Sequence, residues 1–178
     1  KRDFGSWLHE VLQRFHHALS AQPTQDVQER RQYMNHAADQ AQQALGLNEG
    51  EFLPYRSSWP ALRDGYLRWF GTHEATGAQF FQAEAQRQAL LPLAQGALTL
   101  VGQIDRIDHI DRIDPINGAT PAYWVLDYKT ESEDRTKKRI QAGSEDTQLA
   151  FYAALMPDAG LLRAGIALVA QETSLAPD

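Results

Sequence analysis

The sequence predicts an α/β fold with a mixed central sheet flanked by helices, and three observations lead to this prediction. Helical periodicity covers the first part of the chain, up to residue 75. Three extended segments follow in succession. One more helical segment and a last apolar run complete the chain. This order of helices, three strands, helix and strand favours a mixed sheet with helices over a helix bundle or a sandwich of two sheets.

The helical part, residues 1–75, contains three predicted helices. Apolar residues recur at helical spacing from Phe4 to Leu19. A second helix, rich in Gln and Ala, is expected over Thr24–Leu45, with Thr24 as its N-cap and Gly46 as its stop. The cap-like stretch Ser57–Pro60 predicts the start of a third helix, which the glycines of Gly71–Gly77 end.

The second part, residues 78–170, is the predicted sheet with its helix. Three strands are expected, at Gln79–Leu93, Ala97–Ile110 and Ala122–Thr130. Two turn-forming segments, Ala94–Gly96 and Pro115–Gly118, separate them, so the three strands form a β-meander.

A helix and a strand follow the meander. Ser144 is a suitable N-cap for a helix that extends to Met156 and has Gln148 and Tyr152 on one face. The last strand is expected at Leu161–Ala170.

Composition and length limit the classes of function. The chain has 178 residues, of which 43% are hydrophobic, which suits the core of one domain. It contains no cysteine, which excludes disulfides, zinc–thiolate sites, iron–sulfur clusters and thiol nucleophiles. The net charge of −6 argues mildly against a free-standing nucleic-acid binder, although acids that hold a divalent metal also lower the net charge.

The sequence has neither a membrane segment nor a signal peptide. No apolar run approaches the roughly 18 residues that span a bilayer, and the start of the chain, Lys1–Gly5, lacks the apolar region of a signal peptide. We therefore expect a soluble, cytoplasmic protein. Because the chain begins without Met and ends in a loose polar stretch, it is compatible with a single domain, residues 1–178, excised from a longer chain.

Asp127 and Lys129 form the first candidate for chemistry. In the strand that ends the meander their side chains point to the same face, because side chains alternate along a strand. A carboxylate that binds metal, beside an ammonium that orients water or stabilises negative charge, would suit hydrolysis. On this stretch alone, a solvated strand end is the alternative.

The acid that pairs with Asp127 depends on the register of the preceding hairpin. Residues 104–114 read IDRIDHIDRID, with an aspartate at every third position. A five-residue loop sets Asp105 opposite Asp127, whereas a two-residue Asn-Gly turn sets Asp108 there. Pro115 cannot donate a ladder hydrogen bond, which favours the wider loop and therefore Asp105, but the register stays open.

Four short motifs occur in order between residues 5 and 152. They are Gly5-Ser6-Trp7-Leu8-His9-Glu10, Gly102-Gln103-Ile104-Asp105-Arg106-Ile107-Asp108, Leu126-Asp127-Tyr128-Lys129-Thr130 and Gln148-Leu149-Ala150-Phe151-Tyr152. Together they resemble the nuclease domains of the RecB/AddB branch of the PD-(D/E)xK superfamily. The resemblance implies a restriction-endonuclease-like αβββαβ core with additional N-terminal helices, and a metal-dependent DNA nuclease.

The resemblance also implies roles for the matched residues. Asp105 and Asp127 match the two acidic metal ligands, and the backbone carbonyl of Tyr128 often joins them. Lys129 matches the catalytic lysine, and His9 matches a further metal ligand of this branch.

Other residues are implied to support this site. Gln148 and Tyr152 match a helix motif that braces the site or meets DNA, and Glu84 falls where many relatives carry an acid near the metal. A basic cluster beside such a site is a candidate strip for phosphate contacts. It consists of Arg135, Lys137, Lys138 and Arg139.

The implied cofactor is Mg²⁺ or Mn²⁺. Magnesium prefers oxygen ligands, and a histidine nitrogen is more at home with manganese. No iron–sulfur cluster is expected, because the chain has no cysteine. The implied substrate is single-stranded or end-bearing DNA, cut exonucleolytically in repair or recombination, with a helicase subunit or domain as partner and no membrane. The alternative is a catalytically inactive nuclease-fold module that binds DNA or a partner subunit.

The remaining histidines and acids of this region lack such support. We expect them to lie at the surface or to approach the turn; they are His16, His17, His36, His73, His109, Asp108, Asp111 and Asp114.

Overall fold

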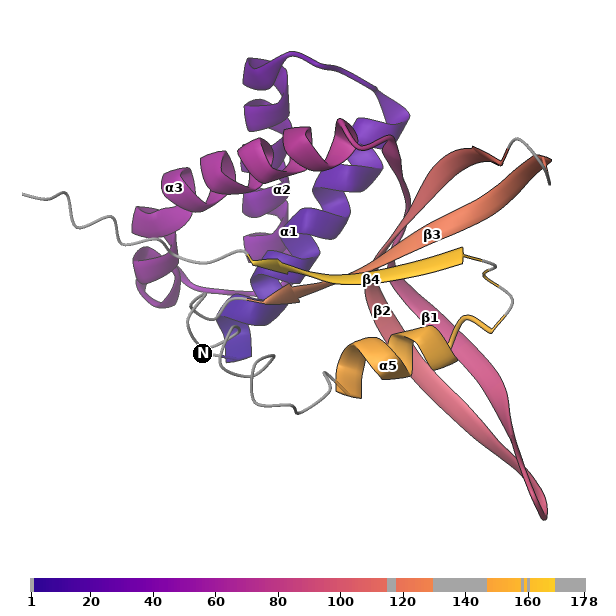
Figure 1. Cartoon of the computed structure of the whole chain (residues 1–178). Coiled ribbons are helices and arrows are strands. Elements are labelled where there is room, and N and C mark those ends of the chain that lie inside the picture. Colours follow the sequence, from indigo (N-terminus) through magenta and orange to yellow (C-terminus); the bar gives the residue numbers. More distant parts are fainter. Residues whose placement is uncertain (1, 115–117, 130–146, 158, 160, 169–178) are drawn as a thin grey trace, which may run out of the picture. The chain divides into compact units, whose positions relative to one another are not determined.

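The computed structural model describes residues 2–114, 118–129, 147–157, 159 and 161–168. Its elements follow one another in the predicted order, which confirms the fold class (Figure 1). They are α1 (Arg2–Ala21), α2 (Val27–Ala44), α3 (Glu49–Glu74), β1 (Ala78–Leu93), β2 (Gly96–Asp114), β3 (Gly118–Lys129), α5 (Thr147–Ala154) and β4 (Leu161–Leu168).

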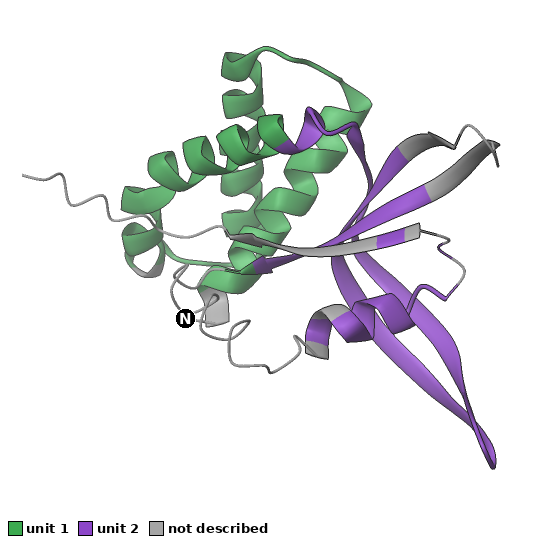
Figure 2. Ribbon diagram, in the orientation of Figure 1, with its two compact units in different colours: residues 1–72, 129–135, 168–178 green, residues 73–128, 136–167 purple. Residues whose placement is uncertain are grey.

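The chain divides into two compact units (Figure 2). Unit 1 comprises residues 1–72, 129–135 and 168–178, and unit 2 comprises residues 73–128 and 136–167. Among the described residues, none of the helices combines the length and the apolarity needed to cross a membrane.

Unit 1 is held together by an aromatic core. Trp7 of α1 is fully buried, and its ring meets Phe52 and Trp59 of α3 edge to face, at centroid distances of 5.0 and 5.2 Å. Its indole Nε1 donates to the carbonyl of Ala38 in α2, 3.2 Å away. The apolar stripe of α1, which the sequence predicts, therefore contacts both other helices.

Two predicted helix starts are wrong. α2 is capped by Asp26 and not by Thr24, because the Asp26 carboxylate accepts from the backbone N–H of Glu29 at 2.8 Å. α3 begins at Glu49, not within Ser57–Pro60. Ser57 and Ser58 donate to carbonyls of the preceding turn, as serines within a helix do. The buried side chains of Phe52 and Trp59 stabilise the helix by packing, which outweighs the tendency of the prolines to interrupt it.

His16 is not at the surface, as the sequence suggests, but buried in unit 1. Only 1% of its surface is exposed, and its Nε2 shares a 2.5 Å hydrogen bond with the hydroxyl of Tyr66. The apolar stripe of α1 extends over this position, and α3 supplies the polar partner that burial requires. His17 and His36 are exposed, as expected.

Unit 2 contains a four-stranded sheet in the order β1-β2-β3-β4. β1, β2 and β3 pair antiparallel in sequence, which confirms the β-meander. β4 lies beside β3 and runs in the same direction, so the sheet is mixed (Figure 1). Its core joins strand residues to two side chains of α5; the members are Ala85, Ile104, Ile107, Val125, Tyr152 and Leu155.

The register of β2 on β3 decides between the two candidate acids. Asp114 pairs with Gly118, and the ladder continues in register to Arg106 opposite Leu126. One residue further, this register sets Asp105 across from Asp127. Asp108 pairs with Trp124 instead, so the register that favours Asp105 is confirmed. Residues 115–117 lie outside the described residues.

Asp108 is buried in a charged cluster, and its expected place at the surface is wrong. Its Oδ1 lies 2.7 Å from Nε of Arg106, and its Oδ2 lies 2.6 Å from Nε2 of His73. All three side chains are nearly inaccessible. The two neighbours provide the charge and the hydrogen bonds that make burial of a carboxylate tolerable.

His73 was likewise expected at the surface, but its imidazole packs edge-on against Trp124 at 4.6 Å between centroids. His109 is half-buried beside Tyr123. The side chains of Asp111 and Asp114 lie outside the described residues.

The charge of Asp108 should make the stability of the protein depend on pH. Burial raises the pKa of Asp108, but the hydrogen bond from His73 and the charge of Arg106 outweigh burial and hold this pKa below its ordinary value of 3.8. A lowered folded pKa means that the stabilisation is present above the unfolded pKa and is lost as the pH falls through the folded pKa.

We expect Asp108→Asn to lower the free energy of unfolding by about 3 kcal/mol or more at neutral pH, because Arg106 then stays buried without its counter-charge. The variant should also lose less stability than the wild type below about pH 4. Urea unfolding over a pH series measures both effects. Equal unfolding free energies of the two proteins at neutral pH would contradict this account of the cluster.

Candidate active site

The neighbouring strands β2 and β3 bring Asp105 and Asp127 together. One hydroxyl, that of Tyr152, lies 3.2 Å from Oδ1 of Asp105 and 3.4 Å from Oδ1 of Asp127. Both acids are buried, with 8% and 1% of their surface exposed. Two carboxylates this close together repel each other when both are charged, so they need hydrogen-bond donors or a cation beside them.

The backbone of β3 supplies one of these donors. The N–H of Tyr128 donates to Oδ2 of Asp105 over 2.8 Å. Tyr128 therefore contacts Asp105 through its backbone.

Helix α5 supplies two more donors. The amide Nε2 of Gln148 donates to Oδ1 of Asp127 at 2.7 Å and to the hydroxyl of Tyr152 at 3.0 Å. Gln148 and Tyr152 are one helical turn apart and so share a face of α5. Burial, together with the charges of Asp105 and Asp127, raises the pKa of Tyr152, so its hydroxyl stays protonated and can donate.

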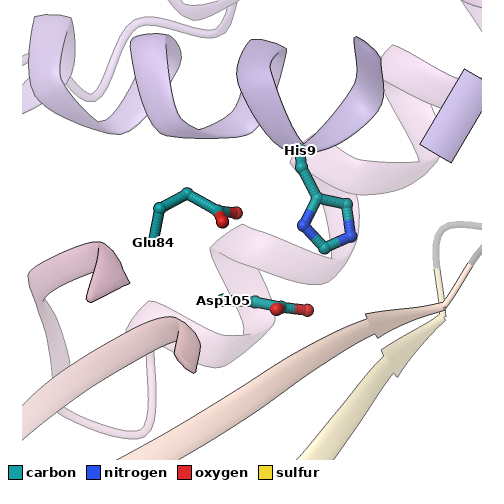
Figure 3. A group of neighbouring side chains, drawn as sticks. All are labelled: His9, Glu84 and Asp105. Carbon is teal, nitrogen blue, oxygen red and sulfur yellow. The ribbon is translucent and has the colours of Figure 1, made fainter. Parts of the chain in front are cut away.

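Glu84 of β1 is the third acid of unit 2 near this point. Its carboxylate and that of Asp105 lie within 4.8 Å of each other (Figure 3). The backbone of Glu84 has φ of 48°, a left-handed conformation that residues other than glycine rarely adopt. The pairing of β1 with β2 also shifts between Phe80 and Gln82, and such a bulge re-aims the side chains that follow it.

Sequence reasoning missed two glutamines, of which one contacts this acid and the other contacts the first glutamine. Gln103 donates to the carboxylate of Glu84, and Gln86 donates to the side-chain oxygen of Gln103. The bond from Gln86 fixes the amide of Gln103 so that its nitrogen faces Glu84. The signal that could have identified the two glutamines is that Gln86 lies opposite Gln103 in the sheet. This pairing depends on the β1–β2 register, which neither residue alone reveals.

The other predicted site residues lie elsewhere in the chain. Lys129 is the last residue of β3 and is half-buried, and strand alternation gives it the same face as Asp127. His9, also labelled in Figure 3, is a half-buried residue of α1 and belongs to unit 1. The basic cluster of Arg135, Lys137, Lys138 and Arg139 lies outside the described residues, as does Ser144.

The donors of this cluster fit a hard divalent cation. Glu84, Asp105 and Asp127 offer carboxylate oxygens, the ligand type that Mg²⁺ and Mn²⁺ prefer. Glutamine and tyrosine side chains donate to all three of these acids. The arrangement therefore gathers oxygen atoms of the kind that such a cation binds.

A mixed sheet that presents paired acids from neighbouring strands, with a lysine two residues beyond the second acid, defines a restriction-endonuclease-like nuclease fold. The family model described as the PD-(D/E)XK nuclease superfamily matches residues 1–175. The chain therefore belongs to this superfamily, whose members are nucleases, that is, phosphodiester hydrolases. No curated protein matches the chain significantly.

We expect Tyr152→Phe to lower the free energy of unfolding by roughly 1.5–3 kcal/mol at neutral pH, because a charged, buried carboxylate loses a hydrogen-bond donor. Tyr123→Phe on the same strand as Asp127 is the matched control, since the ring keeps its contacts with Phe81 and His109. It should change stability by at most about 0.5 kcal/mol. If the two variants unfolded alike, Tyr152 would not stabilise the acidic pair.

Proposed function

We propose that this chain is a metal-dependent deoxyribonuclease of the RecB/AddB-like branch that hydrolyses phosphodiester bonds of DNA. The observation that carries the proposal is that Asp105 of β2 and Asp127 of β3 both contact the hydroxyl of Tyr152, and that β3 ends at Lys129. Membership of the nuclease superfamily and the four motifs in the sequence support the same reading.

The proposed ligands of Mg²⁺ or Mn²⁺ are the carboxylates of Asp105 and Asp127, the carbonyl of Tyr128 and the imidazole of His9, with Glu84 as a further acid. The acids and the carbonyl suit either ion, and the imidazole favours manganese. Such a cation, when bound, polarises the phosphate and lowers the pKa of a bound water.

Lys129 is proposed as the catalytic lysine. Its ammonium shares a strand face with Asp127, from where it can orient an attacking water and stabilise the negative charge that grows on the phosphate oxygens. Gln148 and Tyr152 donate hydrogen bonds to the two carboxylates and fix their orientations. The basic cluster Arg135, Lys137, Lys138 and Arg139 is proposed to contact the phosphates of the strand being cut.

The biological role proposed is exonucleolytic processing of single-stranded or end-bearing DNA in repair or recombination. This role rests on the likeness of the four motifs to the RecB/AddB branch, in which the nuclease works with a helicase subunit or domain. A cytoplasmic setting and the lack of an iron–sulfur cluster belong to the same proposal.

Lys129→Ala should lower the rate of DNA cleavage by about 10²–10³-fold, because a charge that stabilises the transition state is lost. Asp127→Asn should abolish cleavage, as should a chelator of divalent metal. The assay uses linear single-stranded and duplex DNA with Mg²⁺ or Mn²⁺, and circular dichroism confirms folding. Arg68→Ala, an exposed position of α3, is the control and should cleave like the wild type.

Equal cleavage by the wild type and both site variants would show the assignment of these residues to be wrong. Tight DNA binding without metal-dependent cleavage in the wild type would instead favour the inactive nuclease-fold module.

Glu84→Gly and Glu84→Ala separate the backbone strain at this residue from its proposed role as a ligand. Glycine adopts a left-handed φ without penalty, so the glycine variant should be more stable than the alanine variant by about 1 kcal/mol. Both variants should bind Mn²⁺ about 10-fold or more weakly, because a charged oxygen ligand is gone. Urea unfolding without metal and calorimetric titration with Mn²⁺ measure the two effects.

Ala83→Gly is the control for glycine in this strand and should be destabilising by about 0.5–1 kcal/mol. Unchanged Mn²⁺ affinity in both Glu84 variants would remove Glu84 from the ligand set, whatever their stability.

A further inference from the structure

Gly102 of β2 is a glycine for a steric reason. It is not among the glycines with positive φ, so its backbone does not require a glycine. A Cβ placed on it would lie 2.6 Å from Cε1 of Phe151 and 2.8 Å from Cδ1 of Leu155, closer than real Cβ atoms come to any heavy atom. Phe151 belongs to α5 and Leu155 directly follows it, so the missing side chain of Gly102 is what allows this part of the chain to lie so close to β2.

Of the two side chains that touch Gly102, that of Leu155 has the less freedom to move aside, because it is buried whereas Phe151 is half-buried. The two residues are four positions apart, about one helical turn, and so press on the same point of the strand. Leu155 is 2% exposed and packs in the core of unit 2 with Ile104 and Ile107. Carbon atoms in contact normally lie about 3.5–4.0 Å apart, so a methyl group at Gly102 would push its neighbours away by about 1 Å.

A shift of about 1 Å would also affect the contact of α5 with Asp105 and Asp127. Tyr152 lies between Phe151 and Leu155 in the sequence, and its hydroxyl is already 3.2 and 3.4 Å from the two carboxylates. These distances are near the upper limit for a hydrogen bond. Moving α5 away from β2 by about 1 Å would break both bonds.

We propose that Gly102 is a positioning residue of the active site: by letting α5 lie directly on β2, it holds Tyr152 and Gln148 on Asp105 and Asp127. The consequence for metal binding and cleavage rests on the proposed function, whereas the packing itself does not. The experiment therefore uses readouts that need no cleavage.

The first measurement is a double-mutant cycle in unfolding. In the wild-type background Tyr152→Phe should raise the unfolding equilibrium constant about 10-fold or more, because the carboxylate loses its donor. In a Gly102→Ala background the same change should have almost no effect, since the bond is already broken. An undiminished effect of Tyr152→Phe would mean that Phe151 and Leu155 rotate aside while α5 stays in place, and would overturn the proposal.

The second measurement is the affinity for Mn²⁺ by calorimetry. Gly102→Ala should weaken it by about 10-fold, the loss usual when groups that orient metal ligands are displaced. Adding Phe151→Ala removes the nearer of the two contacts and leaves that with Leu155, so it should restore part of the affinity. Gly71→Ala in α3 is the control, because a Cβ there meets no atom within 4 Å. It should bind Mn²⁺ like the wild type.

The outcomes separate the positioning role of Gly102 from the proposed nuclease activity. Undiminished Mn²⁺ affinity in Gly102→Ala, or no recovery with Phe151→Ala, would overturn the positioning role. If Gly102→Ala does not fold, recovery of folding by Phe151→Ala supports the contact, and failure to recover overturns it. A wild type that binds Mn²⁺ and shows the coupling in unfolding, yet cleaves no DNA, would refute the proposed function and leave the role of Gly102 intact.

Discussion

The hydroxyl of Tyr152 is the contact on which the acidic site depends. Asp105 and Asp127 come from neighbouring strands and are both buried, so their charges repel unless donors or a cation lie between them. Three donors are described at these acids: the Tyr152 hydroxyl, the Gln148 amide and the backbone N–H of Tyr128. They require that α5 pack on the sheet and that β2 and β3 keep their register. The fold of unit 2 can therefore be understood as the framework that places these donors on two neighbouring acids.

Asp105 and Asp108 show how one strand gives two acids different roles. Both are buried in β2, three residues apart. Asp108 is neutralised by Arg106 and hydrogen-bonded to His73, and this cluster holds its pKa below the ordinary value. Asp105 accepts hydrogen bonds from the backbone N–H of Tyr128 and from the hydroxyl of Tyr152. The two acids therefore share their burial and differ in the partners described for them.

The sequence predicts most of the fold because its signals are local, and it misses features that depend on distant partners. The change from helical to extended periodicity gives the order of elements, and Pro115 favours the correct register. The burial of Asp108 and His16 could not be read from local pattern, since their partners His73 and Tyr66 lie 35 and 50 residues away. At the site, the spacing of the motifs predicts Asp105 and Asp127, together with Gln148 and Tyr152 of α5. The contact of α5 with Gly102 and the glutamines on Glu84 depend on how strands and helix come together.

The backbone of Glu84 gives the strongest physical reason to consider this acid functional. A left-handed φ in a residue with a side chain costs roughly 1–2 kcal/mol, and strain of this kind clusters at functional sites. Glu84 is only half-buried, so hydrophobic packing of its side chain offsets little of that cost. A ligand that binds only the folded protein adds about 2.7 kcal/mol of stability at 100 times its dissociation constant. A cation held by Glu84 and Asp105 would therefore outweigh the strain, and the strained backbone is what turns the Glu84 carboxylate toward Asp105.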